Sequence, residues 1–210
     1  MHARLLYVMD PMCSWCWGFA PVVEALAAQA AERGVPMELV LGGLRRDQVA
    51  IDAAARVRYL GYWQAVNATT GKLFNFDAGL PEGMRYDTEA ACRAVVTVRS
   101  LDAQSAPLMA QRIQQAFYQE GADVTHAPTL VRLAEEVGIP RIEFAEAFDS
   151  EEQHRATAAD FSWTQDLGIA GFPTLLAEKN GRLALLTNGY QPLEALSPLL
   201  ARWLEHAIDG

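Results

Sequence analysis

The sequence of 210 residues predicts an α/β fold in which a long all-helical insertion interrupts the sheet-forming part of the chain. Three observations predict it. The first 44 residues have a strand-helix-strand pattern, strand patterns are missing from about residue 45 to 155, and a hairpin pattern followed by a helix closes the chain. We therefore expect residues 1–44 and 156–210 to form one domain and residues 45–155 to form a helical insertion domain.

The N-terminal segment has the pattern of a βαβ unit. Leu5 to Met9 form a continuous apolar run, which is typical of a strand whose sheet is covered on both faces. A helix is expected from Cys13 to Gly34, because its apolar residues repeat along one stripe, namely Phe19, Val22, Val23, Leu26, Ala27 and Ala30. Met37 to Leu41 form the next apolar run. The pattern favours two parallel strands joined by a right-handed crossover.

The middle of the chain has helical spacing. One helix is expected over residues 45–66, and residues 71–85 read as a glycine-containing, aromatic loop. The stretch from Phe74 to Tyr86 either lines a substrate groove or caps the helical domain. Asp87 or Thr88 is expected to cap a helix, and further helices follow on apolar stripes. The stripes comprise Ala91, Cys92, Val95 and Val96; Met109, Ile113, Ala116 and Phe117; Leu130, Leu133, Ala134 and Val137; and residues 142–148.

The C-terminal segment returns to strand patterns. Ser150 and Gln153 form a capping-box pattern that opens a helix ending near Leu167. Two apolar runs, 174–177 and 183–187, flank Asn180-Gly181, which is a strong signal for a two-residue hairpin turn. A final helix is expected from about residue 193 onward. Together these elements complete the sheet begun by the first 44 residues.

Composition and charge exclude several classes of protein. The formal net charge is −9 without a basic cluster, so we expect no nucleic-acid partner and no membrane partner. The N-terminal apolar run of five residues, 5–9, is too short for the core of a secretion signal. The expected location is therefore the cytoplasm.

The three cysteines carry most of the functional information. Cys13 and Cys16 form a Cys-Ser-Trp-Cys motif, and a helix beginning at Cys13 favours its thiolate form through the unpaired N–H groups of the first turn. Cys16, one turn later, can close a disulfide with it. Cys92 is expected to be a core residue. A zinc site needs four ligands, and no metal is expected because the histidines are scattered, at His2, His126, His154 and His206.

Phe172-Pro173 forms a second candidate site element. A proline at the start of a strand leaves the backbone before it free to pair with an extended substrate, and we expect a cis Phe172–Pro173 bond here. Ser14 and Trp15 lie between the cysteines, where Trp15 is expected to be partly exposed and to contact substrate. Asp10 either assists proton transfer at Cys16 or belongs to an ordinary Asp-Pro turn.

These motifs together resemble the thioredoxin superfamily. Cys13-Ser14-Trp15-Cys16 after a strand, Pro21, and Gly171-Phe172-Pro173-Thr174 before a hairpin are similar to its active-site elements. The helical insertion resembles the DsbA-like branch, specifically the cytoplasmic FrnE-type proteins grouped with 2-hydroxychromene-2-carboxylate isomerases and kappa-class glutathione transferases. The resemblance implies that Cys13 attacks, Cys16 resolves, and Phe172 with Pro173 faces the substrate. Ser14-Trp15 replaces the Pro-His pair of the periplasmic oxidants.

The sequence therefore predicts a thiol-disulfide oxidoreductase or disulfide isomerase that acts on protein cysteines. It needs no metal or organic cofactor, and glutathione is the candidate redox partner that regenerates the pair. One alternative is a glutathione-dependent isomerase or transferase of small molecules, whose relatives generally have serine at the position of Cys13. A second alternative is a chaperone-like binder that uses the tryptophan surface near the motif.

Overall fold

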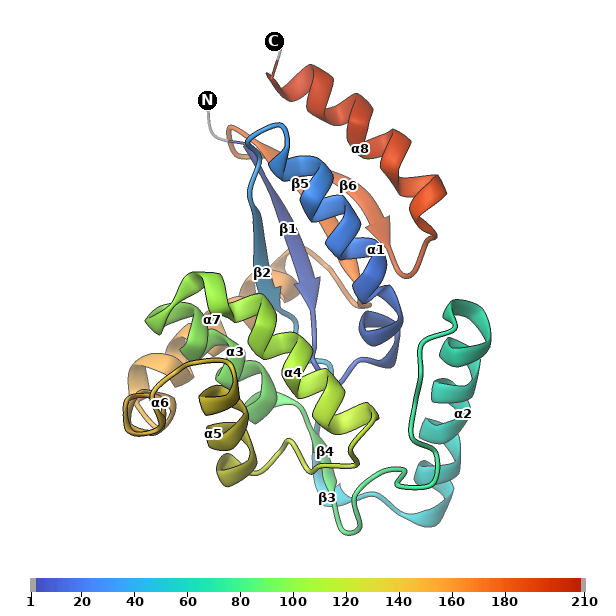
Figure 1. Ribbon diagram of the computed structural model, residues 1–210, viewed down its shortest axis with the longest axis vertical. Helices are drawn as coiled ribbons and strands as arrows, with labels where there is room; N and C mark the ends of the chain where they lie inside the picture. The colour runs from blue at the N-terminus through green and yellow to red at the C-terminus, as the bar shows by residue number, and fades with distance from the viewer. Residues whose placement is uncertain (1–2, 209–210) are drawn as a thin grey trace.

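A four-stranded mixed sheet forms the centre of the computed structural model, which describes residues 3–208 (Figure 1). Its strands lie in the order β2-β1-β5-β6. β1 pairs in parallel with β2, while β1 with β5 and β5 with β6 are antiparallel. The strands are β1 (Ala3–Met9), β2 (Met37–Leu41), β5 (Thr174–Lys179) and β6 (Arg182–Asn188). The two ends of the sequence thus build one sheet, as predicted.

Two helices cover one face of this sheet (Figure 1). α1 (Ser14–Ala31) connects β1 to β2, and α8 (Leu193–Ile208) packs beside it. The Gln29 amide donates to the Ser197 carbonyl at 3.1 Å, and the Ser197 hydroxyl donates back to Gln29 at 2.9 Å. Phe19 and Leu26 of the predicted stripe are fully buried. The crossover helix therefore has the apolar face that its sequence predicts.

The inserted segment lies beyond the carboxyl end of β1, in the lower half of Figure 1. The buried faces of its helices contain the residues of the predicted stripes, including Cys92, Val95, Ile113 and Phe117. The segment contains α2 (Ala53–Thr70), α3 (Glu89–Leu101), a 3-10 turn (Ala103–Ser105), α4 (Ala106–Tyr118), α5 (Ala127–Glu136) and α6 (Arg141–Phe148).

The prediction of an all-helical insertion is wrong in one part. Residues predicted to begin a helix at 45 instead form β3 (Arg46–Ala50), which pairs antiparallel with β4 (Arg85–Asp87). The helix α2 starts only at Ala53, because the Asp52 carboxylate accepts the Ala55 backbone N–H at 2.7 Å and caps it. The insertion is mainly helical, with a two-stranded sheet at its start.

Local signals place the remaining elements correctly. The Ser150 hydroxyl accepts the Gln153 backbone N–H at 3.3 Å and caps α7 (Glu151–Asp166). Asn180 and Gly181 have φ values of 51° and 78°, as the predicted hairpin turn requires.

The two expected domain boundaries, after residue 44 and before residue 156, stay predictions. The helix α7 continues across residue 156. Within residues 3–208 no helix combines the length and apolarity needed to cross a membrane.

Two helical glycines give opposite expectations for stability. A Cβ on Gly18 of α1 would lie 2.7 Å from Val66 of α2, whereas a Cβ on Gly61 of α2 would meet nothing within 4 Å. We expect Gly18→Ala to lower the free energy of unfolding by about 1–2 kcal/mol through overpacking. Gly61→Ala is expected to raise it by about 0.5–1 kcal/mol through helix propensity. Urea unfolding of both variants measures the two changes in the free energy of unfolding. If Gly18→Ala and Gly61→Ala change it equally, α1 and α2 do not pack closely at Gly18.

Candidate active site around Cys13 and Cys16

Cys13 occupies the N-cap position of α1. Its extended backbone (φ −87°, ψ 115°) turns the chain into the helix, and its Sγ accepts the Cys16 backbone N–H at 3.4 Å. The positive end of the helix therefore lies next to this sulfur. Cys13 is 5% exposed, whereas Cys16 is fully buried, and both thiols are free in this structure. Of the two sulfurs, Cys13 is the accessible one.

The segment before β5 lies against Cys13. The Phe172–Pro173 peptide bond is cis, and the Cys13 thiol lies 3.5 Å from the Phe172 carbonyl oxygen, to which it donates. Gly42 makes room for the Phe172 ring, because a Cβ there would lie 2.0 Å from the ring's Cζ. The structure thus brings together the two motifs that the sequence separates by almost 160 residues.

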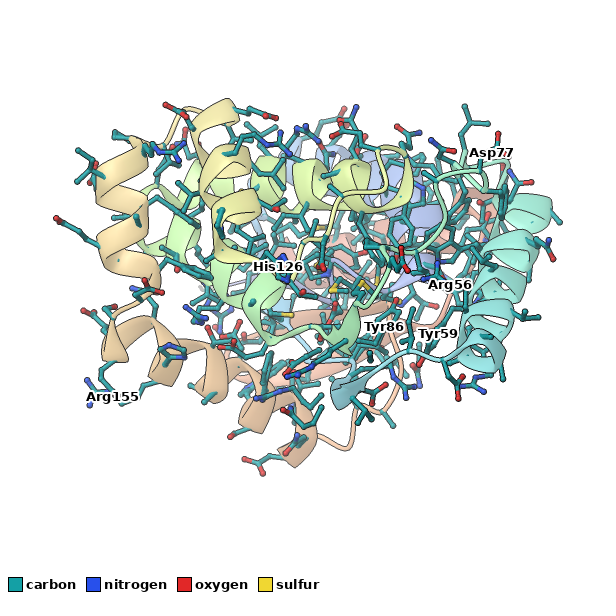
Figure 2. The ribbon with its side chains drawn as sticks, turned by 90° about the horizontal axis from the view of Figure 1, so that it is seen from below. Arg56, Tyr59, Asp77, Tyr86, His126 and Arg155 are labelled. Atoms are coloured by element: carbon teal, nitrogen blue, oxygen red, sulfur yellow. The ribbon has the colours of Figure 1, made fainter. Side chains whose placement is uncertain are left out.

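An aromatic groove of about 330 Å³ opens beside Cys13. The rings of Tyr59 and Tyr86 lie with their centroids 4.7 Å apart, and Figure 2 shows the two side chains next to each other. Arg45 brings a positive charge to this wall, 5.5 Å above the Tyr59 ring. The groove is lined by Met12, Cys13, Ser14, Trp15, Leu44, Arg45, Tyr59, Tyr62, Tyr86, Gly171 and Phe172.

Asp10 is fully buried beneath the active-site turn. Its carboxylate accepts the backbone N–H groups of Met12 at 2.8 Å and Leu44 at 2.7 Å. It also accepts the hydroxyl of Thr88 at 2.6 Å and the thiol of Cys92 at 3.3 Å. Asp10 therefore joins the Cys13 turn to the segment after β2 and to the start of α3.

Burial dominates the electrostatics below Cys13. It raises the pKa of the Cys16 thiol well above the ordinary value, and the neighbouring Cys13 sulfur and the negative charge of Asp10 raise it further. Burial also raises the pKa of Asp10 against the opposing effect of its four hydrogen bonds. Tyr7 is buried with its pKa raised, first by burial and then by the charges of the two cysteines. Cys16 thus holds its proton more firmly than an ordinary thiol.

Four of the six predicted site residues line the groove, whereas Cys16 and Pro173 are not among its lining residues. Ser14, Trp15 and Phe172 line the groove with Cys13. Trp15 is half-buried, and its ring centroid lies 5.9 Å from that of Tyr190. Cys92 is a fully buried residue of α3, as expected, but it also touches Asp10. In residues 3–208 no group of three or more His, Cys, Asp or Glu side chains is arranged to hold a metal ion, and His2 lies outside these residues.

Sequence reasoning missed two of the three tyrosines of the groove, Tyr59 and Tyr62. Tyr59 and Tyr62 belong to α2, and their i, i+3 spacing on one helix face was the available signal. Tyr86 ends the aromatic loop for which two interpretations stayed open, and its hydroxyl donates to the Met12 carbonyl at 2.6 Å. The loop's last residue therefore contributes to the groove and also supports the turn before Cys13.

The family model for the DSBA-like thioredoxin domain matches residues 4–201. The chain belongs to this family. The DsbA-like match includes both halves of the sheet and the whole helical insertion, so it confirms the resemblance stated from the motifs. A search of curated proteins found no match.

Solved structures with the same DsbA-like architecture support this assignment. A proposed protein disulfide isomerase from Nitrosomonas europaea is 39% identical, with a TM-score of 0.91 over 98% of this chain and 99% of that chain. The cytosolic disulfide reductase DsbM from Pseudomonas aeruginosa is 31% identical, with a TM-score of 0.77 over 95% and 98%. A 2-hydroxychromene-2-carboxylate isomerase shares the fold at 13% identity and a TM-score of 0.67, covering 98% of each chain.

The charge of Asp10 leads to a prediction for this DsbA-like site. Because that charge raises the pKa of Cys16, Asp10→Asn should lower the Cys16 pKa, while burial keeps it above the ordinary value. Titration of the Cys16 Cβ signal in ¹³C-cysteine-labelled protein measures the change. Asp102→Asn, at a fully exposed position, is the control and should leave the Cys16 pKa unchanged. An unchanged Cys16 pKa in Asp10→Asn would contradict this electrostatic picture.

Proposed function

We propose that this DsbA-like protein is a cytoplasmic thiol-disulfide oxidoreductase or disulfide isomerase that acts on protein cysteines through Cys13 and Cys16. The observation that carries the proposal is the asymmetry of the pair. The Cys13 sulfur lies at a helix N-terminus in an open groove, while Cys16 lies buried one turn behind it with a raised pKa. An accessible sulfur at a helix N-terminus suits a nucleophile, and a thiol one turn behind it is within reach to resolve the mixed disulfide.

The reaction follows from this arrangement. The Cys13 thiolate attacks one sulfur of a substrate disulfide, forms a mixed disulfide and releases the other substrate sulfur as a thiolate. Cys16 then loses its proton and attacks the Cys13 sulfur, which forms the Cys13–Cys16 disulfide and releases the second substrate thiol. Two electrons pass to the substrate. Two molecules of glutathione return them to the pair and become glutathione disulfide.

The direction of electron flow is proposed to be reducing or isomerising. A glutathione-reduced cytoplasm keeps a dithiol reduced unless its potential is unusually low, which opposes net oxidation. The similarity to a protein described as a cytosolic disulfide reductase supports the same direction and location. The structure of that reductase with glutathione supports glutathione as the redox partner.

The groove favours a polypeptide substrate. The Phe172 carbonyl beside Cys13 is placed to pair with an extended backbone, and aromatic side chains surround the position of a substrate cysteine. We propose that substrates bind with apolar or aromatic residues next to the reacting cysteine. This part of the proposal concerns specificity and has its own test below.

A redox titration tests the central proposal. The protein is equilibrated in glutathione buffers of stepped potential, its thiols are alkylated, and its mass is measured. We expect a reversible change of two thiols with a midpoint nearer the thioredoxin value of about −270 mV than the DsbA value of about −120 mV. Cys92, buried with a raised pKa, is the internal thiol that stays reduced. A pair that does not cycle at any potential would exclude the dithiol mechanism.

Serine variants assign the two roles. Cys13→Ser should reduce the rate of glutathione-dependent insulin reduction by more than about 100-fold, because a hydroxyl cannot replace the thiolate nucleophile. Cys16→Ser should instead accumulate a mixed disulfide with a cysteine-containing peptide, visible by intact mass. Activity toward small molecules that needs glutathione and survives in Cys13→Ser would support the glutathione-dependent isomerase or transferase alternative.

Tyr62 tests the substrate groove. It lines the groove and is 51% exposed, so Tyr62→Ala should fold normally. We expect kcat/KM to fall by about threefold to tenfold for a peptide disulfide with an aromatic residue next to cysteine, and less for one with glycine there. Val57→Ala, at a 72% exposed position on the same helix outside the groove, is the matched control. Equal losses for both peptides would refute aromatic recognition.

A further inference from the structure

The peptide group that joins Met12 to Cys13 is held on both sides. Its N–H donates to the Asp10 carbonyl at 3.0 Å, and its carbonyl oxygen accepts from the Tyr86 hydroxyl at 2.6 Å. The first bond lies within the turn, whereas Tyr86 comes from the insertion, 74 residues from Met12 along the chain. The orientation of this planar group determines the φ angle of Cys13, which is −87° at the helix N-cap. Tyr86 therefore helps to fix the backbone that carries the Cys13 sulfur.

The Tyr86 side chain is itself held in place. Its ring centroid lies 4.7 Å from that of Tyr59, and it meets the Phe117 ring edge-on at 6.2 Å. Tyr86 is buried, and this burial raises the pKa of its hydroxyl well above the ordinary value. The hydroxyl thus keeps its proton and stays a donor to the Met12 carbonyl.

Water cannot replace this hydrogen bond in the folded protein. Met12 is fully buried, so its carbonyl would lose its partner without gaining a solvent molecule if the Tyr86 hydroxyl were removed. The peptide group before Cys13 would then be held only through its N–H. We expect its orientation to become less well defined.

The orientation of this peptide group affects the two redox states of the pair unequally. In the reduced protein the Cys13 sulfur accepts the Cys16 backbone N–H at 3.4 Å. Such a bond is stronger to a thiolate than to a neutral disulfide sulfur, so a well-held backbone stabilises the reduced form more. The Tyr86 hydroxyl also offsets the partial negative charge of the Met12 carbonyl, which would otherwise oppose a thiolate on the next residue. Both effects favour the reduced pair.

We propose that Tyr86 is a positioning residue for the dithiol, which raises the reduction potential of Cys13 and Cys16 by holding the Met12 carbonyl. Tyr86 acts through the backbone of Cys13, in addition to lining the groove. This inference deepens the proposed function and rests on it. The insertion then influences the redox chemistry of the pair as well as the shape of the groove.

Tyr86→Phe tests the role, because it removes the hydroxyl and keeps the ring among its aromatic neighbours. We expect the equilibrium constant for reduction of the Cys13–Cys16 disulfide by glutathione to fall by about threefold to tenfold, the effect of one hydrogen bond. The midpoint then moves to a more negative potential, since the reduced form has lost stability. Titration in glutathione buffers with thiol alkylation and intact mass measures it. No peptide substrate is present, so substrate contacts of the groove do not enter the result.

The reactivity of Cys13 provides a second readout. Alkylation by iodoacetamide requires the thiolate, so Tyr86→Phe should slow the alkylation of Cys13 at neutral pH by about threefold to tenfold. Cys16 and Cys92 are fully buried, which leaves Cys13 as the thiol that reacts first. An unchanged alkylation rate together with an unchanged midpoint would overturn the inference.

Tyr190→Phe is the matched control. The Tyr190 ring lies 5.9 Å from that of Trp15 in the Cys-Ser-Trp-Cys motif, and phenylalanine keeps this contact. The variant loses a hydroxyl near the motif while the bond between Tyr86 and Met12 is retained. We expect the midpoint and the Cys13 alkylation rate of the unchanged protein. Equal shifts in Tyr190→Phe and Tyr86→Phe would show that the effect does not arise at the Met12 carbonyl.

Urea unfolding separates positioning from a purely structural role. Tyr86→Phe should lower the free energy of unfolding of the reduced protein more than that of the oxidised protein, because the lost bond favours the reduced form. Equal losses in the two forms would mean that Tyr86 only stabilises the fold. A pair that does not cycle even in the unchanged protein would contradict the proposed function and this inference together, whereas a pair that cycles with the same midpoint in Tyr86→Phe would contradict the inference alone.

Discussion

The buried carboxylate of Asp10 is the constraint on which the active-site arrangement depends. Its two oxygens accept four hydrogen bonds, from the turn before Cys13, the segment after β2 and the start of α3. These three segments come from the sheet and from the insertion, so Asp10 fixes the insertion against the end of β1. Leu44, which donates to Asp10, and Tyr86, two residues before Thr88, both lie in the groove wall beside Cys13.

Burial makes the two cysteines unequal, and the charge of Asp10 adds to the difference. The Cys13 sulfur accepts the Cys16 backbone N–H at the helix start, while Cys16 lies in the interior, where burial, the Cys13 sulfur and the Asp10 charge all oppose its ionisation. Three residues of spacing place the sulfurs one turn apart, but their surroundings come from different layers of the fold. The local sequence therefore determines the spacing of Cys13 and Cys16, and long-range packing determines how the environments of the two sulfurs differ.

The same contrast between local sequence and long-range packing explains which features of the fold the sequence predicts. β1, α1 and the Asn180-Gly181 hairpin depend on local patterns, and each was predicted from them. β3 was missed because its residues are mostly exposed and polar, and its partner β4 has only three residues. The motifs at Cys13 and Phe172 were recognisable separately. The tyrosine wall and three of the four partners of Asp10 instead arise from tertiary contacts, and Asp10 and Cys92 are 82 residues apart in the sequence.

Under the proposed function, the firmly held proton of Cys16 influences which disulfide chemistry dominates. Resolution of the mixed disulfide requires the Cys16 thiolate. Burial, the largest cause of the raised Cys16 pKa, is still present when Cys13 is bonded to the substrate, so it slows this step and lengthens the life of the intermediate. During that time another substrate thiol can attack and rearrange the substrate's disulfides, which is isomerisation. A faster resolving thiol would give reduction instead. The burial that stabilises the core around Cys16 thus also biases the balance between the two reactions.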